Sequence, residues 1–412
     1  MPFLTTRSLL LALLGLCSVS AHADSLAPAP QCAQLNQAFA RSEHASASFT
    51  WSTQASATSA PAAGGRSIAL WGDSLTSSRD FIDAALKVAG IASATALPSY
   101  IQAGITVPGL RLPLKTACAS KGWQVGYAHK QNRHPAPFSP GFLSLSADSP
   151  GEFLTLDFRT PSASTRVREL TLHYDKPTPD GSLLLGVAVD EGDETLISLS
   201  AAHGTTLQIR PATPLATIKI RLVSGRITLH GLAPLYQDAP ATLLDTFSVP
   251  GGMLRSWSML SERLVPAQSG GAPQYGLVLV QYGTNEGANP DFSRAAYLGY
   301  LRSNLSRMRK LYPRARCILI GPPDRGGIGK AQSGPLPYAA IHHQIALAQQ
   351  QAGAEQRCEF WDWQAAMGGP GSAVRWAKMD PPQMQQDLTH LTAKGYEVSG
   401  QLFAHALHLN KN

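Results

Sequence analysis

The stretch "SIALWGDSLTSSRDFIDAALKVAG", residues 67–90, passes from an apolar run into an amphipathic pattern through Gly-Asp-Ser-Leu. Residues 67–71 predict a strand, and residues 78–90 carry apolar side chains at helical spacing. A strand followed at once by a helix is one unit of an α/β sheet. A serine on such a turn, here Ser74, can be a nucleophile, but Asp73 or Ser74 can equally cap the helix. The tetrapeptide alone favours the capping interpretation.

The pattern of apolar and polar residues changes twice after this stretch. Between about residues 115 and 236 it consists of short alternating runs separated by turn-rich pieces, which predict an antiparallel sandwich or jelly roll. Afterwards "YGLVLVQYG" (275–283) and "ARCILIGPP" (315–323) predict buried parallel strands with a long amphipathic helix between them. The economical arrangement is an α/β domain in two sequence pieces with an all-β domain inserted between them.

The predicted segments follow from these changes in residue pattern. They are a signal peptide (1–23), an N-terminal helix and linker (24–65), the first α/β piece (66–114), the inserted β-sandwich (115–237) and the second α/β piece (238–412).

The first residues have the layout of a secretory signal peptide. Arg7 precedes an apolar run, which ends at the small-residue segment Ala21-His22-Ala23, so we expect export and cleavage after Ala23. The apolar run is shorter than a membrane-spanning helix, and we expect no span elsewhere, because no later segment has about 20 uninterrupted apolar residues. The net charge of +7 falls by one with Arg7. This modest excess suits an anionic polymer such as cell wall, and its scattered distribution argues against nucleic acid.

Four cysteines remain in the predicted mature chain: Cys32, Cys118, Cys317 and Cys358. In an oxidising compartment they allow three pairings. Cys317 with Cys358 is one plausible pair, since both lie near strands that we expect to be neighbours. None lies in a C-x-x-C arrangement, which argues against a zinc or redox site.

Three later stretches could carry chemistry together with Ser74. "QYGTNE" (281–286) places Asn285 at the carboxyl end of a predicted strand, where ligands bind in open α/β folds. "VPGGMLRSW" (249–257) offers glycine N–H groups, and "DLTHLTAKGY" (387–396) places an aspartate three residues before a histidine. Each has an ordinary structural explanation: an Asn turn, a glycine-rich connection and an exposed helix start. The histidines in helical contexts without such an aspartate are interpreted as structural or superficial: His342, His343, His405 and His408.

The order of these pieces resembles the SGNH (GDSL) hydrolase family, whose sequence blocks centre on Ser, Gly, Asn and Asp-x-x-His. The resemblance implies a three-layer α/β/α parallel sheet, here with the inserted β-sandwich. It makes Ser74 the nucleophile, His390 its general base and Asp387 the orienting carboxylate. It also implies an oxyanion hole formed by the backbone N–H groups of Ser74 and Gly251 and the side-chain amide of Asn285. No metal or cofactor is implied.

Two further positions in these blocks are Pro250 and Asp73. The family usually has a polar residue before the glycine of its second block, whereas Pro250 precedes Gly251-Gly252 here. Which of the two glycines donates therefore stays open. Asp73 is interpreted as a turn-stabilising residue and not as part of the triad.

The interrupted domain, with "FWDWQAAMGG" (360–369) before the last block, resembles the peptidoglycan O-acetylesterases of Gram-negative bacteria. That resemblance implies removal of O-acetyl groups from peptidoglycan through an acetyl-serine, in the periplasm or after secretion. The alternatives are an esterase on another acetylated polysaccharide or acyl ester, a transacetylase, and a non-catalytic glycan-binding protein. The insert is a glycan-binding or substrate-orienting module, or a structural brace. Substrate-binding residues and oligomeric state are not predicted.

Overall fold

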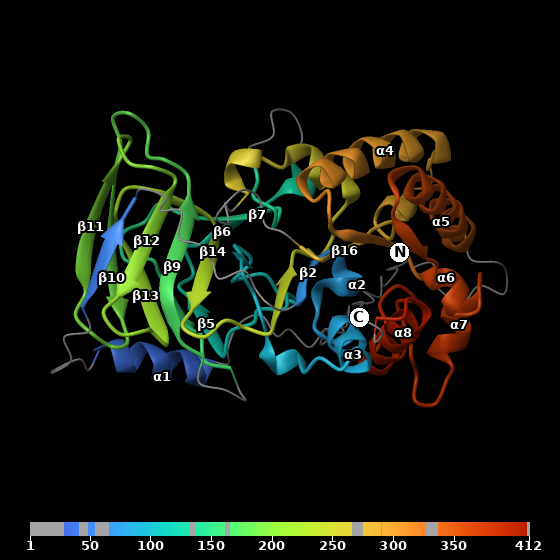
Figure 1. The fold of residues 1–412 in the computed structure, drawn as a ribbon, viewed down its shortest axis with the longest axis horizontal. Coiled ribbons are helices and arrows are strands. Elements are labelled where there is room, and N and C mark those ends of the chain that lie inside the picture. The colour runs from blue at the N-terminus through green and yellow to red at the C-terminus, as the bar shows by residue number, and fades with distance from the viewer. Residues whose placement is uncertain are drawn as a thin grey trace, which may run out of the picture.

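The computed structural model describes residues 29–40, 48–53, 66–131, 137–160, 165–265, 275–289, 291–326 and 337–409. The predicted signal peptide lies outside the described residues. Figure 1 shows two parts side by side, one built of stacked strands and one in which helices pack around a sheet. Among the helices of the described ranges, none has the length and apolar character needed to cross a membrane.

The α/β part contains a six-stranded sheet in which every pairing is parallel. Its spatial order is β18 (Glu359–Trp361), β17 (Arg316–Ile320), β16 (Leu277–Gln281), β2 (Arg66–Trp71), β15 (Thr242–Thr246) and β3 (Ala96–Leu97). The chain extends the sheet on one side of β2 through β15 and β3 and on the other side through β16 to β18. The carboxyl ends of β2 and β16 therefore mark the edge of the sheet at which ligands bind in such folds.

Helices cover both faces of the parallel sheet. The α-helices of this part are α2 (Ser74–Ser77), α3 (Asp80–Val88), α4 (Arg294–Leu311), α5 (Pro337–Gln356), α6 (Trp363–Ala366), α7 (Ser372–Ala377) and α8 (Ala393–Ala406). Alternation along β2 sends Ala69 and Trp71 toward the core formed with α4 and α5, and Ile68 and Leu70 toward the core formed with α3 and α8. This is the predicted three-layer α/β/α arrangement.

The β-domain consists of two antiparallel sheets. The larger sheet contains β1 (Phe49–Ser52), β12 (Thr206–Pro211), β9 (Val167–Tyr174), β14 (Ile227–Tyr236), β7 (Leu143–Ala147) and β6 (Gln124–Tyr127), with β4 (Ile101–Gln102) paired to β14. The smaller sheet contains β11 (Thr195–Ser200), β10 (Ser182–Val189), β13 (Thr217–Ser224), β8 (Phe153–Asp157) and β5 (Thr116–Ala119). Alternate residues of both sheets form one buried core, as the alternating pattern predicts.

Two pairings join strands from outside residues 115–237 to the larger sheet. Residues 49–52, expected within the linker, form β1 and pair with β12, and residues 101–102, expected in the first α/β piece, pair with β14. Pairing at a sheet edge satisfies backbone groups that an exposed linker would leave hydrogen-bonded to water. The pattern of apolar and polar residues does not reveal such pairing. The predicted boundary positions stay predictions.

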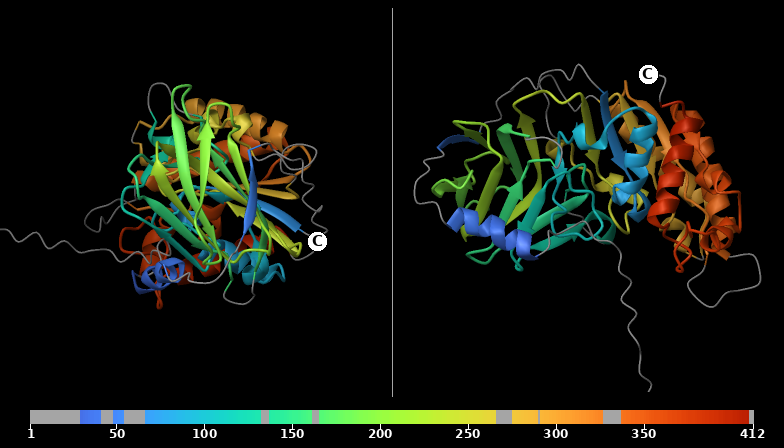
Figure 2. Two further views of the ribbon diagram at one scale, coloured as in Figure 1. Left: turned by 90° about the vertical axis from the view of Figure 1, so that its left-hand side faces the viewer. Right: turned by 90° about the horizontal axis from the view of Figure 1, so that it is seen from below.

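The amino-terminal helix α1 (Ala29–Ala40) lies on the β-domain, as Figures 1 and 2 show from three sides. Cys32 on α1 forms a disulfide with Cys118 on β5, and the Thr155 hydroxyl donates to Asn36. A second disulfide joins Cys317 of β17 to Cys358, which confirms the pairing suggested by their adjacent strands.

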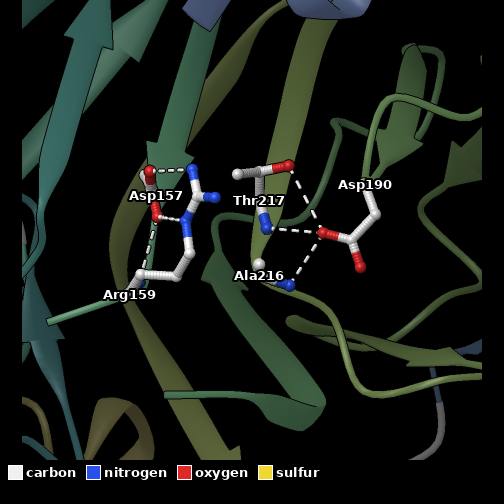
Figure 3. A network of polar contacts seen from close by, with 5 residues as sticks. All are labelled: Asp157, Arg159, Asp190, Ala216 and Thr217. Atoms are coloured by element: carbon white, nitrogen blue, oxygen red, sulfur yellow. Dashed lines mark hydrogen bonds and ion pairs between the residues drawn. The ribbon is translucent and has the colours of Figure 1, made fainter. Parts of the chain in front are cut away.

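Two carboxylates close the end of the smaller sheet (Figure 3). Asp190 Oδ1 accepts from the backbone N–H groups of Ala216 and Thr217 at 2.7 and 2.8 Å, where β13 begins. Asp157, at the end of β8, accepts from Nε of Arg159 at 2.8 Å. The bonds to Asp190 satisfy backbone donors where β13 begins, and the bond to Asp157 fixes the side chain of Arg159 after β8.

The two parts meet at the backbone around Tyr100. Asp245 of β15 is fully buried and accepts from the N–H groups of Ser99 and Tyr100 at 2.7 and 2.9 Å. The hydroxyl of Tyr100 then donates to the carbonyl of His230 on β14 at 2.9 Å. The larger sheet of the β-domain is thereby attached directly to the parallel sheet.

The short 3-10 helices of the described ranges are η1 (Ser93–Thr95), η2 (Ala128–Lys130), η3 (Leu254–Met259), η4 (Glu262–Leu264) and η5 (Glu286–Ala288).

Candidate active site

Ser74 begins the short helix α2 immediately after β2. Asp73 is its N-cap and accepts from the N–H of Leu75 at 2.9 Å. Gly72 has no room for a side chain, because a Cβ there would lie 2.1 Å from Oγ1 of Thr76. This tight strand-to-helix turn presents a half-buried Ser74 at the carboxyl end of β2. The capping interpretation and the nucleophile hypothesis thus describe neighbouring residues, Asp73 and Ser74.

A loop before α8 brings Asp387 and His390 to this serine. Oγ of Ser74 lies 3.0 Å from Nε2 of His390, and Nδ1 of His390 lies 2.7 Å from Oδ2 of Asp387. Oδ1 of Asp387 accepts from the N–H groups of Thr389 and His390 at 2.9 and 3.0 Å. The ring therefore contacts serine with one nitrogen and carboxylate with the other, the relation that a base and its orienting group require.

These contacts decide the charge of Asp387. Burial by itself raises the pKa of this carboxyl, but the hydrogen bonds from the His390 ring and from the N–H groups of His390 and Thr389 outweigh burial and lower the pKa to about 2. Asp387 is ionised at neutral pH and accepts from Nδ1–H of His390. That tautomer leaves Nε2 free to receive a proton from Ser74.

Asp73 holds the Ser74 turn against the next strand. Its N–H donates to Oε1 of Gln281 at 3.2 Å, and Nε2 of Gln281 donates to Oδ2 of Asp73 at 3.2 Å. The pair joins the ends of β2 and β16, and burial raises the pKa of Asp73. The carboxylate that meets the His390 ring is that of Asp387.

The glycine loop after β15 lies beside this turn. Gly251 has φ +76°, a conformation that favours glycine, and the N–H of Val249 donates to the carbonyl of Gly72 at 2.9 Å. The N–H of Gly252 donates within the loop to the carbonyl of Val249 at 2.7 Å. Because this bond occupies the N–H of Gly252, the geometry favours Gly251 over Gly252 as a donor to a ligand.

Asn285 follows β16 and contacts the same loop. Its Nδ2 donates to the carbonyl of Gly252 at 2.9 Å, which uses one of the two amide hydrogens. The structure thus brings Ser74 to Asp387 and His390, and joins the Gly251 and Asn285 loops to each other.

Two residues near the candidate active site were not predicted from the sequence. His129 of η2 comes from the β-domain and is buried, and its Nε2 would lie 3.1 Å from a Cβ on Gly251. Burial, with the charges of Lys130 and Arg255, lowers the pKa of His129 to about 4, so the ring is neutral. Arg325 donates to the carbonyl of Thr284 at 2.8 Å. Neither stretch carries a motif, so only spatial proximity identifies them.

The remaining helical histidines have the environments expected of structural or surface residues. His342 is buried and its Nδ1 lies 2.7 Å from the carbonyl oxygen of Pro323, whereas His343, His405 and His408 are exposed.

Residues 225–398 match the model of the GDSL-like Lipase/Acylhydrolase family. The matched segment of this chain, residues 225–398, is therefore of the GDSL-like acylhydrolase type. The protein is a serine esterase. The matched range includes Gly251, Asn285, Asp387 and His390. Ser74 precedes the inserted domain and lies outside that range, but the fold brings it into contact with His390.

Solved structures resemble this GDSL-like chain at low identity. A structure described as a peptidoglycan O-acetylesterase in action is 20% identical with a TM-score of 0.63, and the match covers 87% of this chain and 98% of that one. A second structure is a carbohydrate esterase family 2 enzyme with a carbohydrate-binding domain, from Corynascus thermopiles (Myceliophthora fergusii). It is 14% identical with a TM-score of 0.29, and the match covers 69% of this chain and 98% of that one. The first establishes a shared fold. No curated protein sequence matches the chain.

Proposed function

We propose that this GDSL-like esterase removes O-acetyl groups from a cell-wall polysaccharide and that peptidoglycan is its substrate. The observation that carries the reaction is the continuous contact from Ser74 Oγ through the His390 ring to Asp387, at 3.0 and 2.7 Å. The substrate is supported by the shared fold with a protein described as a peptidoglycan O-acetylesterase.

The proposed reaction is acyl transfer to water. Ser74 Oγ attacks the acetyl carbonyl while Nε2 of His390 takes its proton, and the protonated ring then returns that proton to the departing sugar oxygen. Water, deprotonated by His390, then attacks the carbonyl carbon of the acetyl-serine. The resulting tetrahedral intermediate collapses, which releases acetate, and His390 returns the proton to Ser74 Oγ. Asp387 keeps Nδ1 protonated and stabilises the imidazolium that forms.

The oxyanion of each tetrahedral intermediate would be held by the backbone N–H groups of Ser74 and Gly251 and by Nδ2 of Asn285. The bond from Asn285 to Gly252 supports this assignment, because it fixes the amide beside the glycine loop. Donors held in place before the reaction stabilise the charge that appears in the transition state.

Asn285→Ala is expected to lower kcat by about 10²- to 10³-fold with little change in KM, because the donor acts on charge that the ground state lacks. Steady-state hydrolysis of 4-nitrophenyl acetate measures both constants. Asn289→Ala is the control, since the side chain of this nearby, exposed asparagine accepts from the N–H of Asp291 on the surface. A change in KM alone would refute the oxyanion role.

The substrate proposal is tested by comparing acetate release from O-acetylated peptidoglycan with release from acetylated xylan under matched conditions. We expect faster release from peptidoglycan. Faster release from xylan would overturn the peptidoglycan assignment and leave the esterase mechanism intact, whereas transfer of acetyl to an added sugar would identify a transacetylase.

The proposed location is the periplasm. Two disulfides, Cys32 to Cys118 and Cys317 to Cys358, support it, because such bonds persist in oxidising compartments. For the β-domain we propose that it orients the substrate. Its contribution of His129 beside Gly251 supports that role, because the insert then borders the proposed oxyanion hole.

A further inference from the structure

Glu286 joins the two loops that contain Gly251 and Asn285. Its Oε1 accepts from the backbone N–H of Leu254 at 2.7 Å, and its Oε2 accepts from the backbone N–H of Gly283 at 3.1 Å. Leu254 follows the glycine loop, whereas Gly283 precedes Asn285 in the loop after β16. One side chain therefore spans two segments that are about 30 residues apart in sequence.

A carboxylate suits this position better than the amide of glutamine. It presents two acceptor oxygens, which match the two N–H donors, whereas glutamine has one acceptor and would turn an NH₂ group toward one of those donors. Keeping a carboxylate here is costly. Burial raises the pKa of Glu286 to about 7, and the nearby Asp73 acts in the same direction. A group kept despite that cost is a candidate for a functional role.

The contacts of Glu286 lie on both sides of the proposed oxyanion hole. The bond to Leu254 acts on the loop three residues after Gly251, and the bond to Gly283 acts two residues before Asn285. The bond from Asn285 to the carbonyl of Gly252 is a third link between the same loops. Oxyanion donors must lie within about 2.7–3.1 Å of the charge, so the separation of these loops affects the rate directly.

We infer that Glu286 is a positioning residue that holds the Gly251 N–H and the Asn285 amide at the separation that an oxyanion requires. The inference rests on the proposed function, because it assigns a role within that oxyanion hole. Glu286 contacts the backbone of both loops and acts on the reaction through them.

Glu286→Gln is expected to lower kcat for 4-nitrophenyl acetate by about 10- to 100-fold with KM nearly unchanged, because a displaced oxyanion donor weakens transition-state binding. The matched control is Asp324→Asn. Asp324 is a buried carboxylate that, like the half-buried Glu286, bridges distant segments. It accepts from Nε2 of Gln364 at 2.8 Å and from the N–H of Ala373 at 2.9 Å. It contacts neither the Gly251 loop nor the Asn285 loop through these bonds, so its replacement should reduce thermal stability and leave kcat unchanged.

The outcomes separate the inference from the proposed function. If the wild-type protein neither hydrolyses acetyl esters nor reacts with a serine-directed phosphonate, the proposed function is wrong. If the wild type is active and folded Glu286→Gln retains its kcat, or loses no more than Asp324→Asn does, the inference is wrong. A specific kcat loss, with slower phosphonate labelling of Ser74, supports it.

Leu254→Pro removes the donor of the bond to Glu286 and leaves the carboxylate in place. It tests the inference if Glu286→Gln does not fold. It removes the N–H donor at the first residue of η3, a position that tolerates proline, after an extended Met253. We expect a kcat defect of the same kind, with less than additive loss in the double variant, because both changes weaken the link between Leu254 and Glu286. Leu254→Ala, which removes the buried side chain and keeps the N–H, is the control for lost packing. Full kcat in folded Leu254→Pro would overturn the inference.

Discussion

Ser74→Ala is expected to lower ester turnover by about 10⁶-fold without unfolding the protein. The variant removes only the hydroxyl that contacts Nε2 of His390, and Asp73 and Gly72, which shape the turn, remain. Without that oxygen no acetyl-enzyme can form, so acetate release and phosphonate labelling should both disappear. Any residual hydrolysis would reflect substrate binding and the oxyanion donors alone.

The measurements are initial rates with 4-nitrophenyl acetate, labelling with a fluorescent phosphonate, and thermal melting of both proteins. Ser198→Ala is the control, because this serine is exposed on β11 of the β-domain. Turnover retained by a folded Ser74→Ala protein would move the nucleophile to another residue. Loss of activity with an unchanged level of labelling would also contradict the assignment.

Asp387→Asn is expected to lower kcat by about 10⁴-fold. Oδ2 of Asp387 now accepts from Nδ1 of His390, and the Oδ1 oxygen accepts two backbone N–H groups. An asparagine that keeps its oxygen on those backbone donors turns its NH₂ group toward Nδ1. This stabilises the tautomer with the proton on Nε2, so the ring can no longer accept the proton of Ser74.

The pH profile of the wild type provides a second check on Asp387. Its folded-state pKa is lowered to about 2 from an ordinary value of 3.8, so its ionised form stabilises the fold above about pH 4, and this contribution is lost as the pH falls toward 2. Activity lost at milder acidity therefore does not arise from protonation of Asp387. A stabilising contribution of Asp387 that is already lost between pH 6 and pH 4 would contradict this charge state.

Asp362→Asn is the control for Asp387→Asn. Asp362 is a half-buried aspartate that caps α6 by accepting from the N–H of Ala365 at 2.9 Å. We expect it to change stability slightly and kcat not at all. Equal kcat losses in the two variants would indicate a general structural effect.

Much of the fold was predictable because it rests on local patterns. The apolar run of β2, the alternating runs of the β-domain and the helical spacing of α4 each reflect burial on a face with a fixed period. The disulfide between Cys317 and Cys358 followed from neighbouring parallel strands. By contrast, the pairing of β1 with β12 and of β4 with β14 depends on exposed backbone edges, which short segments satisfy without a distinctive composition.

The candidate site divides in the same way. The residue types in Ser74, Asn285, Asp387 and His390, in that order, carry a recognisable chemical pattern, so the sequence by itself determined the class of reaction to expect. Only the tertiary structure decided that the two α/β pieces bring Ser74 within 3.0 Å of His390 across 316 residues. It also shows that the N–H of Gly252 donates to the carbonyl of Val249, which favours Gly251 as the proposed oxyanion donor.

The role inferred for Glu286 likewise depends on structure alone, since its partners are backbone groups that every residue carries. A sequence encodes which side chains can donate, accept or titrate. Distances between loops far apart in the chain arise from the packing of the whole molecule, and those distances determine which of the available groups act together.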